Sequence, residues 1–350
     1  MVALKKIFNP KGGSMKRVFV IILAVVFLLS TVSLFAGSKK EEVKEKIKVG
    51  LVTDVGKVDD KTFNQFAYEG MMRAAEEFGL EANYIETQQP TDYDKNIQTF
   101  AEEGYEMIIT VGFMITDATL KMAGQYPDIK FSGVDQFYEK PLPNTMGLLF
   151  SEDQSGFVAG ALAAMMSKSG VIGCVAGMEI PPVIKFRRGY ENGAKYINPK
   201  IKVLGVYIDS FTAPDRGKAA AEAQIAEGAD VIFGAGGPTG SGGIVAAMEK
   251  GAYGIGVDQD EYFTTMGGGP APYLLSSAMK RVDNAVYDSI KAFAEGTFEG
   301  GHYVGTAANA GIGYAPFHDT SSKVSKEVKN KLDEILKKLA DGSLDTGVKL

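Results

Sequence analysis

The strongest constraint on the fold is the alternation of short apolar runs with amphipathic stretches along the chain. The stretches at 63–79, 93–104, 215–228 and 282–296 have helical spacing, and each ends at a glycine, as helices often do. Alternating strands and helices predict an α/β fold with parallel sheets and with ligands at the carboxyl ends of the strands. The expected strands are 47–53, 82–86, 107–112, 129–134, 145–150, 170–176, 202–208, 230–234, 252–257 and 273–277.

The chain is long enough for two such units. Its 350 residues exceed one typical domain of about 100–150 residues. The order strand, polar loop, helix, strand occurs at 79–112 and again at 198–236. Two similar lobes are therefore expected in place of one large sheet.

The N-terminus carries a targeting pattern. From Met15 a basic start is followed by an apolar run over 18–36, small residues up to Ser38, and a charged linker at 39–46. This predicts a secretory signal peptide over 1–38 that is cleaved after Ser38, with a retained membrane anchor as the alternative. In both cases the folded part is exported.

Composition argues against several functions. Residues 1–38 hold five basic residues and no acid, so the rest of the chain has 32 basic and 43 acidic residues, which disfavours nucleic-acid binding. The chain has no P-loop sequence, and with only His302 and His318 it has little material for a histidine-based metal or catalytic site. Its one cysteine, Cys174, is expected to be a buried, inert thiol. No cofactor, metal or catalytic residue is predicted.

A glycine-rich turn at 234–240 is similar to a dinucleotide-binding loop and is followed by an acid, Asp258, at the end of the next strand. Its spacing is G-x-G-x-x-x-G, and Pro238 disturbs the turn, so an NAD-dependent oxidoreductase is the less favoured interpretation. A loop whose backbone approaches another ligand explains the glycines equally well.

Acids stand where many α/β proteins have phosphate-binding glycines. Asp54, Asp59 and Asp60 precede Phe63 and Asn64 at the expected start of a helix. Carboxylates accept hydrogen bonds from hydroxyls and base N–H groups, and they repel phosphate. A phenyl ring can stack on a planar base, and an amide can pair with its edge. The acids could instead cap the helix.

Four further residues complete this pattern. Asp135 and Asp258 each end a strand that is expected to be buried, and Phe186 could cover the second face of a base. Lys280 could donate to a hydroxyl or neutralise a carboxylate. The alternatives are that the two phenylalanines lie in the core and that the lysine is solvated. The pattern favours a nucleoside or a sugar over a nucleotide.

The chain resembles the basic membrane protein family of bacterial ABC-transporter substrate-binding proteins, whose members include purine nucleoside receptors. The resemblance spans roughly 47–315, and it implies a type I periplasmic-binding fold with two Rossmann-like lobes joined by a three-stranded hinge. Lobe 1 would contain 47–150 and about 280–310, and lobe 2 would contain 151–279 and about 311–345. The matching stretches are TDVGKVDDKTFNQFAYEG, GFMITDA, FSGVDQ, SGFVAGALA, GMEIPPVIKFRRGYENGAKYINP, GAGGPTGSGG, GVDQDEY and SSAMKRVDNAVY.

The resemblance also implies roles for single residues. The base would be sandwiched by the rings of Phe63 and Phe186, and its edge would be bound by Asn64 and Asp135. The ribose would be held by Asp258, Lys280, Asp54 and the backbone of Gly236 and Gly237. Asp60 and Met114 would make further contacts. Ser38 stands where the family usually has a lipid-bearing cysteine, so the protein would be soluble in the periplasm, anchored by an uncleaved helix, or altered in sequence.

The expected function is a non-enzymatic, monomeric receptor outside the cytoplasm. It would bind guanosine, inosine or adenosine and deliver it to an ABC permease and its ATPase. A binding protein for another small ligand, such as a sugar, remains an alternative. A sugar-responsive repressor is disfavoured by the signal sequence and by the absence of a helix-turn-helix pattern ahead of residue 47.

Overall fold

The computed structural model describes residues 46–349. The predicted signal peptide at 1–38 and nearly all of the predicted linker lie outside these residues. Within 46–349, every helix is too short or too polar to cross a bilayer.

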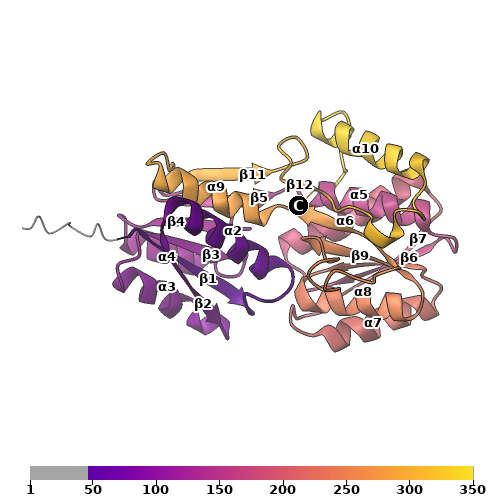
Figure 1. Ribbon diagram of the computed structural model, residues 1–350, viewed down its shortest axis with the longest axis horizontal. Helices are drawn as coiled ribbons and strands as arrows, with labels where there is room; N and C mark the ends of the chain where they lie inside the picture. The colour runs from indigo at the N-terminus through magenta and orange to yellow at the C-terminus, as the bar shows by residue number, and fades with distance from the viewer. Residues whose placement is uncertain (1–45, 350) are drawn as a thin grey trace, which may run out of the picture. The chain divides into compact units, whose positions relative to one another are not determined.

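The first of two sheets is entirely parallel, with the strand order β11-β5-β4-β3-β1-β2 (Figure 1). Helices α2 and α9 pack on one face, and α3 and α4 pack on the other. Alternate residues of β1 serve the two layers: Val49 and Leu51 join the α2/α9 core, and Val52 joins the α3/α4 core. The elements are β1 (Lys48–Val55), α2 (Phe63–Phe78), β2 (Glu81–Thr87), η1 (Pro90–Asp92), α3 (Tyr93–Glu102), β3 (Met107–Val111), α4 (Thr116–Gln125), β4 (Lys130–Val134), β5 (Thr145–Phe150), α9 (Val282–Ala294) and β11 (Gly301–Gly305).

The second sheet has the order β12-β10-β9-β8-β6-β7 and is parallel except for β12. Helices α5, α6 and α10 contribute to the core on one face, and α7 and α8 cover the other. Cys174 is buried in β6, as predicted, and burial raises the pKa of its thiol to about 12. The elements are α5 (Glu152–Met166), β6 (Val171–Ala176), α6 (Pro181–Ile197), β7 (Lys202–Tyr207), α7 (Pro214–Ala226), β8 (Val231–Ala235), α8 (Gly237–Glu249), β9 (Tyr253–Asp258), β10 (Leu274–Lys280), β12 (Ile312–Tyr314), η2 (His318–Thr320) and α10 (Lys326–Ala340).

The predicted α/β class, with two parallel-dominated sheets, is confirmed. All ten expected strands are present, and the sequence missed β11 and β12. We call the first sheet with its helices lobe 1 and the second sheet with its helices lobe 2. We propose that their boundaries are those expected from the sequence, because β11 pairs in the first sheet and β12 in the second.

The chain passes between the two sheets three times: from β5 to α5, from β10 to α9, and from β11 to β12. Two backbone hydrogen bonds connect these crossings. Ser151 N donates to Gly305 O at 2.8 Å, and Arg281 N donates to Gly311 O at 2.8 Å. The crossings therefore form one hydrogen-bonded hinge.

Helices α5 and α6 approach closely through glycines. A Cβ atom at Gly156 or Gly160 of α5 would collide with a backbone carbonyl of α6, and one at Gly189 or Gly193 of α6 would collide with a carbonyl of α5. The two helices can therefore pack this closely only because glycines line the face that each presents to the other. This contact fixes α6, which carries Phe186.

We expect Gly160→Ala to destabilise the protein by about 1–3 kcal/mol, because the new methyl group meets the Tyr190 carbonyl in a packed interior. Gly124→Ala is the matched control, since nothing lies within 4 Å of that helical position. It should be neutral or stabilise by up to about 1 kcal/mol. Urea unfolding followed by circular dichroism measures both. Equal stability of the two variants would contradict the close packing.

Candidate functional site

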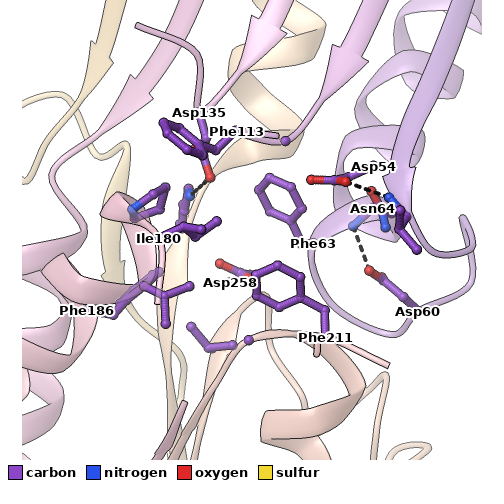
Figure 2. Close-up of a pocket in the computed structure, with 18 residues that line it drawn as sticks. Asp54, Asp60, Phe63, Asn64, Phe113, Asp135, Ile180, Phe186, Phe211 and Asp258 are labelled. Carbon is purple, nitrogen blue, oxygen red and sulfur yellow. Dashed lines mark hydrogen bonds and ion pairs between the residues drawn. The ribbon is translucent and has the colours of Figure 1, made fainter. Parts of the chain in front are cut away.

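A cleft of about 590 Å³, including the space at its mouth, lies where strand ends of both sheets meet. Ten of the eleven residues predicted from the sequence line it, as Figure 2 shows for those that it labels. Its lining consists of Asp54, Val55, Asp60, Phe63, Asn64, Gly112, Phe113, Asp135, Ile180, Pro182, Val183, Phe186, Phe211, Gly236, Gly237, Val257, Asp258 and Lys280.

The exception among the predicted residues is Met114, which the structure places outside the lining. Its side chain packs against the apolar core beneath α3 and α4. Its backbone N–H lies close enough to the Asp54 carboxylate to stabilise the charge of that group. A ligand contact for Met114 stays a prediction.

Four phenylalanines reach the cleft, although the sequence pointed to two. Phe63 begins α2, and Phe186 lies on α6, where it also packs edge-on against Phe233 with ring centroids 6.2 Å apart. Phe186 thus combines the two proposed roles of core residue and cleft residue. Phe113 and Phe211 were missed. Both closely follow a strand, β3 and β7, so the strand-end argument could have found them.

Lys280, the last residue of β10, is buried with an exposed side-chain fraction of 1%. Its Nζ donates to Asp135 Oδ2 at 2.7 Å and lies 3.0 Å from Glu152 Oε1. Burial alone would lower the pKa of this ammonium, but the surrounding carboxylates raise it. Nζ also lies 5.1 Å from the ring centroid of Phe63 and 5.8 Å from that of Phe186. Lys280 therefore neutralises carboxylates, which is one of the two roles considered for it from the sequence.

Glu152 is a further residue that the sequence did not reveal. It begins α5 just after β5, and it is 1% exposed. Besides Lys280, it binds Lys185 Nζ at 3.1 Å, and Lys185 immediately precedes Phe186 on α6. Ion pairs therefore run from Asp135 in lobe 1, through the hinge, to α6 in lobe 2.

Asp135 and Asp258 occupy equivalent turns in the two lobes. Each belongs to the tetrapeptide Gly-Val-Asp-Gln, at 133–136 and 256–259, and each has a left-handed backbone, with φ of 63° and 64°. Such a conformation costs a non-glycine residue about 1–3 kcal/mol and persists where the surroundings enforce it. It turns both carboxylates toward the cleft (Figure 2).

Burial shifts the protonation of these two acids. Desolvation raises the pKa of Asp135 to about 6 against the opposing effect of Lys280. It raises the pKa of Asp258 to about 8, again against the effect of Lys280. Near neutral pH the Asp258 carboxyl therefore holds a proton, and it can donate as well as accept hydrogen bonds.

Asp54 and Asp60 have structural partners of their own. Asp60 caps α2 by accepting from the backbone N–H groups of Thr62, Asn64 and Gln65 at 2.9, 3.0 and 3.1 Å. Asp54 accepts from the Tyr93 hydroxyl and from Val55 N. Burial raises the pKa of both carboxyls. The capping alternative thus holds for Asp60, and a ligand contact for either acid stays a prediction.

The glycine loop contacts lobe 2 as well as the cleft. Gly236 has φ of 131°, and a Cβ atom there would lie 2.6 Å from Gly177 N. A Cβ atom at Gly234 would collide with the carbonyl of Gly240. Close backbone packing between β8, α8 and the end of β6 therefore explains these glycines without a pyrophosphate. Gly236 and Gly237 also line the cleft.

Two buried acceptors in the cleft lining have no hydrogen-bond partner among residues 46–349. These atoms are Asn64 Oδ1 and Asp135 Oδ1. A buried acceptor without a donor is costly, so the arrangement suits a ligand that brings N–H or O–H groups. Within 46–349, no group of three or more His, Cys, Asp or Glu residues could hold a metal ion.

Comparisons with known proteins bear on the family and the fold of this chain. The family model described as ABC transporter substrate-binding protein PnrA-like, Bmp, matches residues 47–343. Basic membrane protein A of Borreliella burgdorferi is 32% identical over 325 residues, which cover 91% of this chain and 93% of that protein. An uncharacterized lipoprotein of Pyrococcus abyssi is 33% identical over 293 residues, which cover 79% of this chain and 71% of that protein. A solved ABC transporter solute-binding protein from Aeropyrum pernix has a TM-score of 0.78 at 27% identity, covering 85% of this chain and 92% of its own.

The raised pKa of Asp258 predicts that the stability of the protein depends on pH. An unfolded aspartate has a pKa of about 3.9, whereas that of folded Asp258 is about 8, so the folded state binds more protons between these values. Stability contributed by the protonated group is therefore lost as pH rises from about 4 to about 8.

Asp258→Asn removes this dependence, and asparagine tolerates the left-handed backbone. Relative to the wild type, the variant should gain stability between pH 5 and pH 8, by up to roughly 4 kcal/mol. Urea unfolding across this range measures the gain. Asp128→Asn, at an exposed position, is the control. Parallel pH profiles for the wild type and Asp258→Asn would refute the buried, protonated acid.

Proposed function

Because this chain belongs to the PnrA-like, or Bmp, family of ABC transporter substrate-binding proteins, we propose that its cleft binds a purine nucleoside for delivery to an importer. Guanosine, inosine and adenosine are the candidate ligands. The observation that carries the proposal is that the rings of Phe63 and Phe186 line one cleft beside Lys280, whose charge is already compensated by buried carboxylates.

The rings supply the site for the base. Their centroids share Lys280 Nζ as a neighbour at 5.1 and 5.8 Å, and both side chains line the same cleft. A planar base between them would be stacked on both faces. Stacking on aromatic side chains contributes about 1–3 kcal/mol per base. Asn64 Oδ1 and Asp135 Oδ1, the acceptors without protein partners, suit the N–H groups of a purine edge.

The charges favour a nucleoside over a nucleotide. Among the described residues that line the cleft, four are aspartates and one is a lysine, and that lysine is paired with Asp135 and Glu152. A phosphate group would therefore meet carboxylates and no available cation. Hydroxyl groups of a ribose, in contrast, can donate to a carboxylate or accept from the protonated Asp258.

The proposal extends to location and partners. A substrate-binding protein of an ABC importer acts outside the cytoplasm, next to a permease with its ATPase, and it has no catalytic step of its own. The lipoprotein relative from Pyrococcus abyssi supports a place at the membrane surface. Since Ser38 replaces the cysteine needed for lipid attachment, we propose that this chain reaches the membrane through the permease or an N-terminal anchor.

A ligand panel tests the proposal. Isothermal titration calorimetry of the purified protein should detect binding of at least one of guanosine, inosine and adenosine, and no binding of ribose or of guanosine monophosphate. Calorimetry suits this chain, which has no tryptophan to report binding by fluorescence. Binding of ribose or of the nucleotide, without any nucleoside, would overturn the ligand assignment. Mass spectrometry of ligand released from the protein provides an independent identification.

Phe63→Ala should weaken nucleoside binding roughly 5- to 150-fold, because one stacking face of the base is lost. Phe263→Ala is the matched control, since this ring is 62% exposed and lies outside the cleft lining. Its dissociation constant should equal that of the wild type. Unchanged affinity of Phe63→Ala would favour a ligand without a base, such as a sugar.

A further inference from the structure

A glutamine of lobe 2 makes a direct hydrogen bond across the cleft to the backbone of lobe 1. Gln259 Nε2 donates to the carbonyl oxygen of Thr62 at 2.7 Å. Both residues are buried, with exposed fractions of 4% and 0%. Neither residue belongs to the cleft lining. Their contact therefore joins the lobes next to the site without occupying it.

The equivalent glutamine of lobe 1 behaves differently. Gln136 occupies the same position of the Gly-Val-Asp-Gln turn, yet its amide donates to Thr110 and Gly112 and accepts from Tyr138, all within its own lobe. The Gly-Val-Asp-Gln sequence alone therefore does not place the glutamine side chain across the cleft. The hydrogen bond of Gln259 to lobe 1 depends on the residues around Gln259.

The acceptor is held in place by lobe 1. The loop before α2 is fixed by Asp60, which caps the helix, and by Val58 N, which donates to Glu86 Oε1 at 3.0 Å. Thr62 O also accepts the first helical hydrogen bond, from Phe66 N at 3.0 Å. The carbonyl is thus presented to lobe 2 in a defined direction.

The donor and the acceptor each adjoin a residue of the candidate site. Thr62 immediately precedes Phe63, and Gln259 immediately follows Asp258, so the hydrogen bond lies one residue from a ring on one side and from an acid on the other. Opening of the lobes would break it and separate these two groups.

We propose that Gln259 is a positioning residue for ligand binding, which stabilises the closed arrangement of the lobes through Thr62 and thereby holds Phe63 opposite Asp258. For the identity of the ligand this inference rests on the proposed function. The closed arrangement itself can be measured without a ligand.

The experiment compares the wild type with Gln259→Met, which keeps the length of the side chain but cannot donate, and with the smaller Gln259→Ala. Spin labels are placed on Tyr84→Cys in β2 and Val206→Cys in β7, which are 44% and 37% exposed, while native Cys174 is buried. Double electron–electron resonance between the two spin labels then reports the distances between the lobes in ligand-free protein. Gln98→Met, in the exposed face of α3, is the control.

We expect a short-distance population in the wild type and in the control, and a shift toward longer distances in both Gln259 variants. In calorimetry these variants should bind guanosine, inosine or adenosine about 2- to 10-fold more weakly, as the loss of one hydrogen bond predicts, with thermal stability close to that of the wild type.

Identical distance distributions in all proteins, or a wild type without the short population, would overturn the role of Gln259. Weaker binding with an unchanged distribution would also overturn it, because it would mean that Gln259 acts through something other than closure. If the wild type binds no nucleoside, the proposed function fails, and the distance measurement still decides the role of Gln259.

Discussion

The buried ammonium of Lys280 is the interaction on which the rest of the site depends. Removing a charge from water costs several kcal/mol, and only closely placed partners can offset that cost. Asp135 and Glu152 are such partners, at 2.7 and 3.0 Å. They come from the end of β4 and the start of α5, so one cation brings a lobe 1 strand and two hinge crossings to a single point. Because an unpaired member of this group would be a buried, uncompensated charge, the three positions are fixed together.

This arrangement supports the proposal that a cleft with so many charged groups takes an uncharged ligand. The ammonium is surrounded by the rings of Phe63, Phe150 and Phe186, with centroids 5.1, 5.2 and 5.8 Å away, and its charge is shared between two carboxylates. A ligand gains little by adding another charge to a balanced cluster. It gains more by stacking on the rings and by satisfying the acceptor oxygens that the protein leaves without donors.

The sequence predicted those features that depend on local pattern. Ten strands follow from apolar runs, and Asp135 and Asp258 follow from the rule that ligands bind at strand ends. Strands β11 and β12 were missed because they are short, with five and three residues, and carry no continuous apolar run. The role of Glu152 and the reach of Gln259 depend on contacts between distant segments, which periodicity does not encode. Met114 lies outside the cleft lining because its side chain packs against the α3/α4 core, a direction that the resemblance did not supply.

The two Gly-Val-Asp-Gln turns also show that the local sequence does not determine the chemistry of an aspartate within it. Their sequences and backbone angles agree, yet Asp135 binds a lysine directly, whereas Asp258 has only its more distant charge. Burial acts on both acids, and the closer cation keeps the pKa of Asp135 near 6 while that of Asp258 rises to about 8. Near neutral pH one turn therefore offers mainly an acceptor and the other a donor as well. Two equal scaffolds can thus hold two chemically different ends of one ligand, and the difference arises from what each lobe packs around its acid.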